Sequence, residues 1–295
     1  MHTIKEKITW IDIVKPTKAD IAFLKEKFGI HPIILDELLN PSARAKVESY
    51  DHYLYLTYHL PVYDPAQKTS RQAEIDFLIF KDHVITVRYE ELEAVDAFMG
   101  NLNASSEFRE KVLGGSTLLP VYHIIETTIA FSLRQLRHIE ENIRTISLEI
   151  FKGNGRKLLE KISYVKRDLL DYHLISRPQK IVLASLASVG VDFWGTQSKI
   201  YTDDLLGDEL KVQQHIEHYL ETVKSLEETN AQRLNVKMNR SMQIFTILAF
   251  FTFPLSLFTA VYSLANRSME FWFWFGGIAA TTIIIPLLFL ERDTF

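Results

Sequence analysis

Two long uncharged runs near the C-terminal end most constrain what this chain can fold into. The first, IFTILAFFTFPLSLFTAVY (Ile244 to Tyr262), has 19 residues, and the second, FWFWFGGIAATTIIIPLLFL (Phe271 to Leu290), has 20. A bilayer core of about 30 Å needs about 20 apolar residues at about 1.5 Å rise each, so both runs have spanning length. The alternative is a pair of buried core helices, but uncharged runs this long are uncommon in soluble cores. The sequence predicts a two-span membrane protein, although its mean hydropathy is only +0.01.

The positions of the basic residues predict the orientation in the membrane. Of 33 Lys and Arg, only Arg267 and Arg292 follow residue 243, whereas Arg233, Lys237 and Arg240 stand just before the first run. Basic flanks stay on the cytoplasmic side. The opening MHTIKEKITW carries charges where a signal peptide needs an apolar core. We expect a multi-pass protein of the cell (inner) membrane with both termini cytoplasmic.

Composition and motifs exclude several classes of function. The absence of cysteine excludes disulfides and thiolate metal sites. Residues 1–243 hold 31 Lys and Arg against 34 Asp and Glu, a net charge of −3 that argues against a nucleic-acid partner. The sequence has no P-loop, GxSxG, HExxH or Rossmann glycine pattern, so we expect no enzyme and no organic cofactor. His215 and His218 could contribute to a Zn²⁺ site, but further ligands are not evident nearby, which favours a surface or structural role.

The first 120 residues alternate between strand and helix signals. Runs rich in β-branched and aromatic residues predict strands over 9–14, 52–60, 74–80 and 83–89, with the last two forming a hairpin around Lys81 and Asp82. Between the first two strands, Thr17 is a candidate N-cap and Gly29 a candidate C-cap of one helix, and a second short helix ends before Pro41. This pattern predicts a cytosolic α/β domain.

From Pro120 onward the hydrophobic period is helical. A first amphipathic helix ends at FKGNGR, and a second runs from about Arg156 to Asp192. A third begins near Thr202, capped by that residue, Asp203 or Asp204, and no Pro or Gly interrupts it between Gly207 and Pro254. It is therefore expected to continue into the first span. The predicted segments are an α/β domain (1–120), a cytosolic helical stalk (121–243), a first transmembrane helix (244–262), an outer loop (263–270), a second transmembrane helix (271–290) and a cytosolic tail (291–295).

The third helix shows two different faces. One carries apolar residues that recur at helical spacing, mostly every three or four positions, as expected for a side packed on other helices: Ile216, Leu220, Val223, Leu226 and Leu234. The other is a line of heptad positions joined by residues at intermediate steps: Glu221, Glu228, Asn235, Asn239, Met242, Ala249, Phe253, Ser256, Ala260 and Ser263.

Copies packed around an axis with this heptad line inward would form a pore of stacked rings. Carboxylate rings concentrate cations, and uncharged amides and hydroxyls can bond the water shell of a divalent ion, which Mg²⁺ gives up reluctantly. The alternative is an ordinary solvated and packing face. The line enters a membrane span, where polar side chains tend to face protein or water, and this keeps the pore as a hypothesis.

Four stretches resemble the CorA family of divalent metal-ion transporters, in order and spacing: WIDIVKPT (10–17), FGIHPIILDELLN (28–40), KVESYDHYLYL (46–56) and MNRSMQIFTILAFFTFPL (238–255). The resemblance covers the whole chain. It implies an α-helical two-span membrane protein with a cytosolic α/β N-terminal domain and long stalk helices, assembled as a homopentameric funnel. The first span would line the pore and the second would form an outer ring.

The selectivity signature of that family is missing. The resemblance places Gly-Met-Asn directly after a tyrosine at the outer end of the first span, but here Tyr262 is followed by Ser263, Leu264 and Ala265. In the family the asparagine amides are thought to bind the hydrated ion, and Ala265 has no side-chain oxygen. The candidate outer mouth comprises Leu264, Ala265, Asn266, Arg267 and Glu270. Arginines there would repel cations, and the glutamates could offset them; Asn266 could replace the missing amide only if the loop shifts.

The resemblance also implies a regulatory metal site between subunits. In the family, a carboxylate of the HPLxLED stretch faces an aspartate at the start of the neighbour's stalk helix across a divalent ion. The matching residues are Glu37, beside Asp36, and Asp204, beside Asp203. The alternative is that these four are capping and surface acids.

The sequence thus favours a passive divalent cation channel or transporter with altered selectivity. Mg²⁺ is the expected substrate and regulator, with Zn²⁺ and Co²⁺ as alternatives, and the expected partners are further copies of the chain and the lipid bilayer. The competing hypothesis is a non-conducting membrane sensor or scaffold that keeps the fold.

Overall fold

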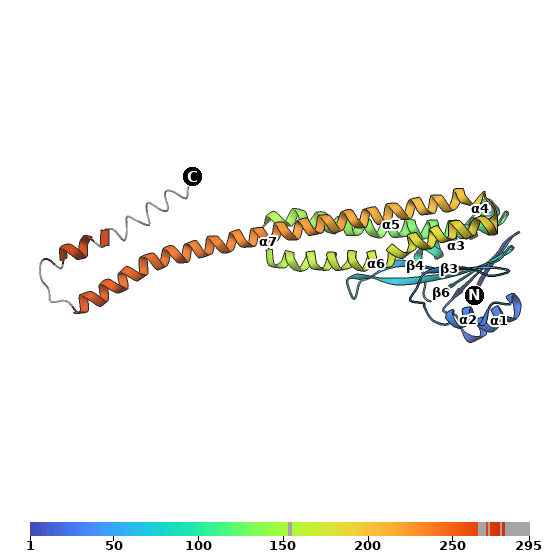
Figure 1. The fold of residues 1–295 in the computed structure, drawn as a ribbon, viewed down its shortest axis with the longest axis horizontal. Coiled ribbons are helices and arrows are strands. Elements are labelled where there is room, and N and C mark those ends of the chain that lie inside the picture. Colours follow the sequence, from blue (N-terminus) through green and yellow to red (C-terminus); the bar gives the residue numbers. More distant parts are fainter. Residues whose placement is uncertain (153–154, 265–269, 271, 278, 281–295) are drawn as a thin grey trace. The chain divides into compact units, whose positions relative to one another are not determined.

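Residues 1–152, 155–264, 270, 272–277 and 279–280 are described by the computed structural model (Figure 1). Of residues 155, 156 and 262–264 only the backbone is described. The chain divides into two units, Met1–Glu227 and Glu228–Phe295. The boundary falls inside one helix, α7 (Ser198–Leu264).

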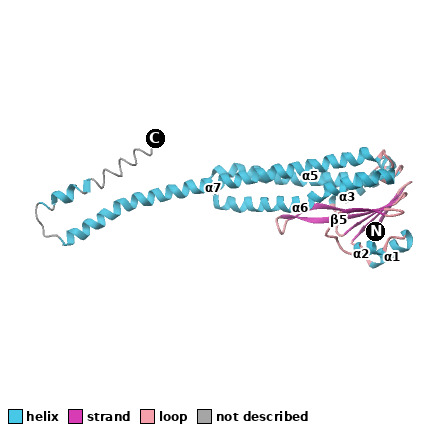
Figure 2. Cartoon of the chain, in the orientation of Figure 1, coloured by secondary structure: helices cyan, strands magenta, loops and turns pink. Residues whose placement is uncertain are grey.

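The first unit contains a six-stranded mixed sheet with helices on both of its faces (Figure 2). Its strands, in spatial order, are β1 (His2–Lys5), β2 (Thr9–Val14), β6 (His83–Arg88), β5 (Thr69–Ile79), β4 (Leu54–Asp64) and β3 (Lys46–Ser49). Only the β2–β6 pair is parallel. The four strands expected from sequence are present, and β5 and β6 form the predicted hairpin, closed by Phe80 N donating to His83 O at 2.8 Å. The four-residue strands β1 and β3 were missed because they are too short to show a period.

Local chemistry explains the two helices that follow β2. Helix α1 (Lys18–Phe28) begins with a capping box, in which the Thr17 hydroxyl accepts from the Asp20 amide at 3.3 Å and Asp20 accepts from the Thr17 amide at 2.9 Å. It ends at Gly29, whose φ of 62° is the left-handed cap that glycine adopts without strain. Both predicted caps are confirmed. Helix α2 (Pro32–Glu37) follows, with its proline in the first turn.

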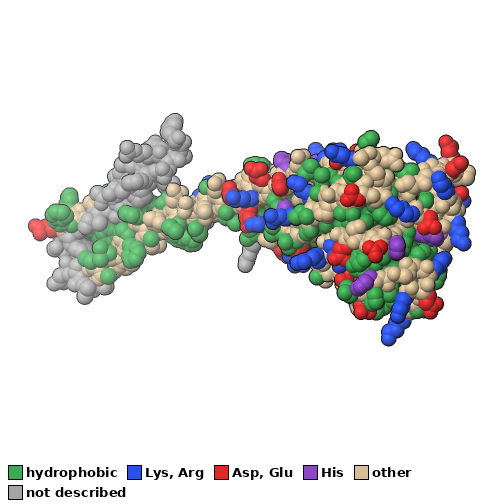
Figure 3. Space-filling view, turned by 45° about the vertical axis from the view of Figure 1, so that its right-hand side comes forward, with side chains coloured by type: hydrophobic (Ala, Val, Ile, Leu, Met, Phe, Trp, Pro, Cys, Tyr) green, Lys and Arg blue, Asp and Glu red, His purple; other side chains and the backbone are tan. Residues whose placement is uncertain are grey.

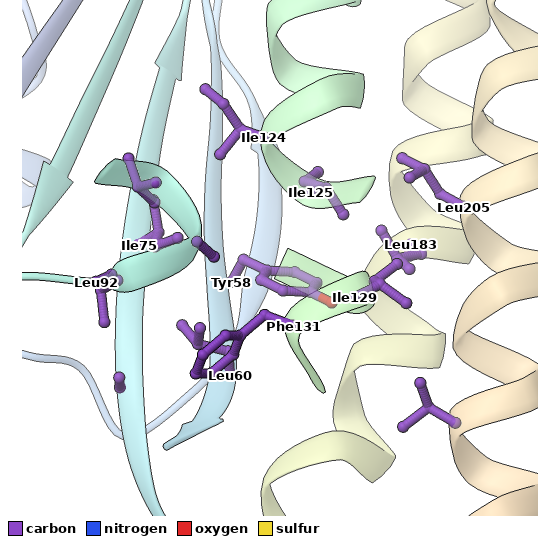
Figure 4. Packing of buried hydrophobic residues seen from close by; sticks show 14 of the residues in the cluster. Tyr58, Leu60, Ile75, Leu92, Ile124, Ile125, Ile129, Phe131, Leu183 and Leu205 are labelled. Carbon is purple, nitrogen blue, oxygen red and sulfur yellow. The ribbon is translucent and has the colours of Figure 1, made fainter. Parts of the chain in front are cut away.

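The sheet is covered on both faces, because alternate strand residues point to opposite sides. Leu54, Leu56 and Ile75 face a core shared with the helices that follow the sheet, and Tyr55 and Leu78 face a smaller core under α1 and α2. The larger helical layer contains α3 (Glu93–Ala104), α4 (Ser106–Leu113), α5 (Leu118–Glu149), a 3-10 turn (Ile150–Lys152), α6 (Gly155–Trp194) and the first part of α7. Figure 4 shows Tyr58 and Leu60 of β4 beside Phe131 of α5, with Ile75 of β5 next to Leu92. Leu183 of α6 and Leu205 of α7 lie on the side of α5 away from the sheet.

The start of the third long helix corrects the sequence expectation. Helix α7 begins at Ser198, not near Thr202. The chain turns at Gly195, whose φ is 92°, and the Ser198 hydroxyl donates to the Gly195 carbonyl at 2.7 Å. Thr202 is buried inside the helix and donates to the Ser198 carbonyl at 3.3 Å. Asp203 and Asp204 therefore lie in the second turn and are not caps.

In the second unit, α7 continues as helix through Pro254 to Leu264 and contains the first uncharged run. Within the described residues this is the one helix long and apolar enough to cross a membrane, and none of its apolar window is buried in the chain. Figure 3 shows hydrophobic side chains over this part of the helix. A core helix of a soluble protein would be buried. Most of the second uncharged run lies outside the described residues, so its expected span remains a prediction.

Candidate functional site

In the first unit, α7 separates its packing face from its polar face as the heptad analysis predicts. Ile216 and Val223 are buried in the larger core, and Leu220 and Leu226 pack partly against it. Glu221, the first member of the heptad line, is exposed. Glu221 follows Ile216 by five positions, so at about 100° per residue the two side chains point about 140° apart around the helix.

In the second unit, the remaining described members of the heptad line are on the surface of α7. Met242 is 59% exposed and Phe253 74%, and Ala249 is half-buried. The other members are exposed: Glu228, Asn235, Asn239, Ser256 and Ala260. At 3.6 residues per turn, the line from Glu221 to Ala260 falls within an arc of about 100°. A single helix of this register can therefore present all of them toward one side.

Phe253 and Ser256 are linked within that line. The Ser256 hydroxyl donates to the Phe253 carbonyl at 2.7 Å, so its hydrogen is already used within the helix. Its oxygen lone pairs can still accept a hydrogen bond. A ring of such oxygens one turn beyond a ring of phenyl groups can accept from the water shell of an ion.

The candidate outer mouth is described only in part. Ser263 and Leu264 form the last residues of α7 by backbone, and their side chains lie outside the described part of the chain. Ala265, Asn266 and Arg267 also lie outside it. Glu270 is exposed.

Glu37 of the candidate regulatory site is paired inside its own chain. Its Oε1 accepts a hydrogen bond from Lys46 Nζ at 3.1 Å, and Lys46 also contacts Glu48 Oε1 at 3.2 Å. Burial lowers the pKa of Lys46, but the hydrogen bonds to the two glutamates outweigh it, and the pKa lies above its usual value. Lys46 is therefore charged at neutral pH.

The second carboxylate oxygen of Glu37 is differently placed. Oε2 lies 2.9 Å from Lys46 Nζ but outside hydrogen-bonding geometry, and it is buried without a hydrogen bond to any described residue. A buried oxygen with unused lone pairs is costly unless something else binds it. Both carboxylate oxygens of Glu37 thus lie beside the Lys46 ammonium, and an ion that bound Glu37 would have to compete with this lysine.

Asp204, the other carboxylate of the candidate regulatory site, is held by a tyrosine of the neighbouring helix α5. Its Oδ2 accepts from the Tyr122 hydroxyl of α5 at 2.7 Å, and that hydroxyl also lies 3.2 Å from Glu126 Oε1. Burial and the bond to Asp204 raise the pKa of Tyr122, so it stays a donor. Asp36 and Asp203 are exposed. The tyrosine fixes the Asp204 carboxylate while leaving it at the surface.

The two halves of the candidate metal site do not meet in one chain. Glu37 ends α2, which covers one face of the sheet, and Asp204 lies on α7 in the layer over the opposite face (Figure 1). Among the described residues no three His, Asp or Glu side chains converge as a metal site. Any ion shared by these carboxylates must therefore lie between two copies.

A buried acid on α7 was missed by the sequence analysis. Glu209 is 3% exposed, accepts from Gln213 Nε2 at 3.1 Å and accepts from the Tyr58 hydroxyl of β4. Burial raises its pKa to about 8. The sequence does contain a signal for this burial. Glu209 lies four residues after Leu205 and three before Val212, both of which are buried, so it belongs to the packed face of the helix.

A second buried acid lies on β5. Asp76 accepts from the hydroxyls of Tyr55 at 2.9 Å, Thr57 at 2.7 Å and Tyr89 at 2.8 Å. Burial, followed by the charge of Glu74, raises its pKa to about 7. Two of its partners lie on β4 and the third directly follows β6, so only the sheet order reveals this cluster.

Comparison with known proteins shows which family this chain is similar to. The family model described as CorA-like Mg²⁺ transporter protein matches residues 5–292. The cobalt/magnesium transport protein CorA of Thermotoga maritima is 20% identical, over 95% of this chain and 79% of that protein. CorA of Methanocaldococcus jannaschii is 23% identical, over 96% of this chain and 89% of that protein. The solved structure of the M. jannaschii CorA magnesium transporter superposes with a TM-score of 0.79 at 20% identity, covering 99% of this chain and 92% of that one.

Proposed function

The chain belongs to the family of CorA-like Mg²⁺ transporter proteins, and from this premise we propose that it is a homopentameric divalent cation channel with altered selectivity, gated by cytosolic divalent ions. Mg²⁺ is the first candidate for substrate and regulator. The relatives named as Mg²⁺ and Co²⁺ transport proteins support this choice of ions. Flow is passive, down the electrochemical gradient.

One observation carries the proposal: polar and small side chains on the α7 heptad line are exposed on a helix whose apolar window is also exposed. In a membrane, exposed apolar residues face lipid, whereas Ser256 needs a water or protein partner. Asn235 and Asn239 continue the same line just before the span. Helices assembled with this line inward satisfy both requirements. The rings then run from Glu221 through the asparagines and Phe253 to Ser256, a path that hydrated cations can follow.

Altered selectivity follows from the outer end of the path. Ser263, Leu264 and Ala265 stand where the family signature has Gly-Met-Asn, so no ring of asparagine amides stands at position 265. The entrance then offers hydroxyl and backbone oxygens in place of amides, and the pathway selects less by contact at the mouth and more by the Asn239 and Ser256 rings. Zn²⁺ and Co²⁺ are alternative substrates for the same reason.

Regulation is assigned to Glu37 and Asp204, with Asp36 and Asp203 beside them. Opposed carboxylates on neighbouring copies repel without a cation, so an ion between them stabilises the closed arrangement. The Glu37 side chain is 32% exposed, so part of it can face a neighbouring copy, and this supports the role. Lys46 competes with the ion for Glu37, so a higher ion concentration is needed to occupy the site.

The second candidate function is a non-conducting sensor or scaffold. The absence of Gly-Met-Asn and the presence of Arg267 at the expected mouth favour it. It keeps the same cytosolic carboxylates and the same assembly, so only transport separates the two functions.

Ion flux decides between them. The full-length protein is placed in liposomes, and uptake of Mg²⁺, Ni²⁺, Co²⁺, Zn²⁺ and K⁺ is measured at low and high internal Mg²⁺. We expect divalent flux that falls at high internal Mg²⁺. Absence of flux for every ion under both conditions would contradict transport and leave the sensor.

The regulatory site has its own test. Replacing Glu37 and Asp204 together by alanine should reduce the protection that Mg²⁺ gives against proteolysis of the purified protein. The matched control replaces the exposed acids Glu107 and Glu217, which lie outside the ion path and the regulatory site, by alanine and should keep the protection. Equal protection in both double variants would remove the regulatory site from this proposal.

A further inference from the structure

Two isoleucines are exposed beside the candidate regulatory carboxylates. Ile33 on α2 is 61% exposed, and Ile200 on α7 is 76% exposed. They are the exposed large hydrophobic side chains of α2 and of the first-unit part of α7 (198–227). A single exposed isoleucine needs no explanation, so the argument depends on what surrounds each of them.

Each isoleucine shares a helix face with the carboxylates assigned to the ion. Ile33 precedes Asp36 and Glu37 by three and four residues, and Ile200 precedes Asp203 and Asp204 by the same steps. Residues three and four apart on a helix are surface neighbours. The same apolar and acidic arrangement therefore occurs on both elements.

Each face also carries one charged residue that can pair with a residue of the other face. Asp36 on α2 and Lys199 on α7 are exposed, and neither makes an ion pair with a described residue of its own chain. Lys199 directly precedes Ile200, and Asp36 lies one turn after Ile33. A contact between the two isoleucines brings the lysine and the aspartate within reach of each other, and leaves Glu37 and Asp204 for the ion.

Only a second copy of the chain can make this contact. Helices α2 and α7 belong to the layers on opposite faces of the sheet, so Ile33 and Ile200 of one chain are separated by it. We propose that Ile33 of one copy packs against Ile200 of the next, beside the divalent ion, as an apolar contact that persists without the ion. This inference rests on the proposed function, because it places Glu37 opposite Asp204 of a neighbouring copy.

The contact has a consequence for gating. Two different patches meet, so the interface is of the head-to-tail kind, which forms a ring when the rotation between successive copies closes, as the proposed homopentamer requires. Loss of the ion leaves the carboxylates repelling, while burial of the isoleucines still holds the copies together. The ring then loosens without dissociating, which allows the ion to act as a reversible regulator.

The absence of cysteine makes a direct test available. The double variant Ile33→Cys with Ile200→Cys is made in the full-length protein, oxidised with diamide, a thiol oxidant that needs no metal ion, in Mg²⁺ and again after chelation, and separated without reductant. We expect a ladder of cross-linked species whose largest member is the closed ring, in both conditions and more slowly after chelation. The control pair is Ile181→Cys with Ile200→Cys, since Ile181 is 70% exposed on α6; it and each single variant should give no ladder.

Light scattering of the same samples separates the failures. An oligomer that cross-links no faster than the Ile181 control contradicts the isoleucine contact and leaves the proposed assembly intact. A ladder that disappears on chelation while the oligomer remains contradicts the ion-independent contact. A monomer in Mg²⁺ contradicts both this inference and the assembly that the proposed function requires. Both positions are exposed, so the variants should keep the wild-type circular dichroism.

Discussion

Lys46 Nζ lies 2.9 Å from Glu37 Oε2 and occupies part of the space in which a divalent ion would approach that carboxylate. The pair is half-buried, with exposed side-chain fractions of 22% for Lys46 and 32% for Glu37. The Lys46 ammonium and the divalent ion proposed to bind between chains would therefore compete for one carboxylate.

Replacing Lys46 with methionine should strengthen the response to Mg²⁺. Methionine keeps the length of the side chain and removes its charge, so Glu37 regains its full negative charge toward an ion. We expect half-maximal protection against proteolysis at a lower Mg²⁺ concentration than in the wild type. The control is Lys161→Met, which removes an exposed ion pair with Glu149 on the helical layer. An unchanged Mg²⁺ midpoint in Lys46→Met would show that Glu37 does not bind the ion.

Phe253→Ala should raise basal ion flux. The phenyl group is 74% exposed on the heptad line, and a ring of such groups excludes water from a narrow path. Removing it widens and wets that level, so divalent uptake into liposomes should rise severalfold at high internal Mg²⁺. Leu255→Ala is the matched control, because Leu255 is 62% exposed about 160° away on the same helix. Equal effects of the two changes would place Phe253 outside the path.

Restoring the family signature should change selectivity. The triple change Ser263→Gly, Leu264→Met and Ala265→Asn places an amide where alanine now stands. Amides can bond the water shell of Mg²⁺, so Mg²⁺ uptake should rise relative to Zn²⁺ uptake in the same liposomes. The same change with alanine kept at position 265 serves as control and should leave the ratio unchanged. An identical ratio in the full triple variant would mean that selection occurs deeper in the path.

Glu209 should make folding stability depend on pH. Its pKa is about 8 in the folded chain, above the usual glutamate value, so the folded state holds the proton more tightly than the unfolded chain. The free energy of unfolding should therefore fall by up to about 1.4 kcal/mol per pH unit between roughly pH 5 and 8, and no further above that range. Asp76, whose pKa is raised to about 7, adds a slope of the same sign.

The measurement is thermal unfolding of the detergent-solubilised protein across this pH range. Glu209→Gln keeps the hydrogen-bonding shape without a titrating proton and should flatten the slope to the part contributed by Asp76. Glu217→Gln, at an exposed position on the same helix, should keep the wild-type slope. A wild-type slope in Glu209→Gln would refute the assignment.

Arg88→Met should destabilise the first unit strongly. Arg88 and Asp12 are 2% and 1% exposed, and Arg88 Nη2 contacts Asp12 Oδ2 at 3.0 Å and Asp96 Oδ1 at 2.6 Å. Removing the cation leaves Asp12 buried and uncompensated, which costs about 3–5 kcal/mol. Arg71→Met breaks the more exposed pair with Glu90 and should cost less than about 1 kcal/mol. Chemical unfolding of both variants provides the comparison.

Several elements could be predicted because their signals are local. The N-cap at Thr17, the glycine cap at position 29 and the hairpin at Lys81 and Asp82 each depend on residues within one turn. The start of α7 was predicted four residues late, because Thr202 and two aspartates resemble a cap, whereas the turn at Gly195 allows Ser198 to begin the helix.

The sequence by itself determined the uncharged run carried by α7 and the separation of an apolar from a polar face along that helix, because helical period and hydrophobicity are properties of neighbouring residues. Only the tertiary structure decided that Lys46 neutralises Glu37, that Glu209 is buried under Tyr58, and that Glu37 and Asp204 lie in layers on opposite faces of one sheet. These relationships depend on which strands pair and which face each helix covers, and such long-range choices are made by burial of the whole core.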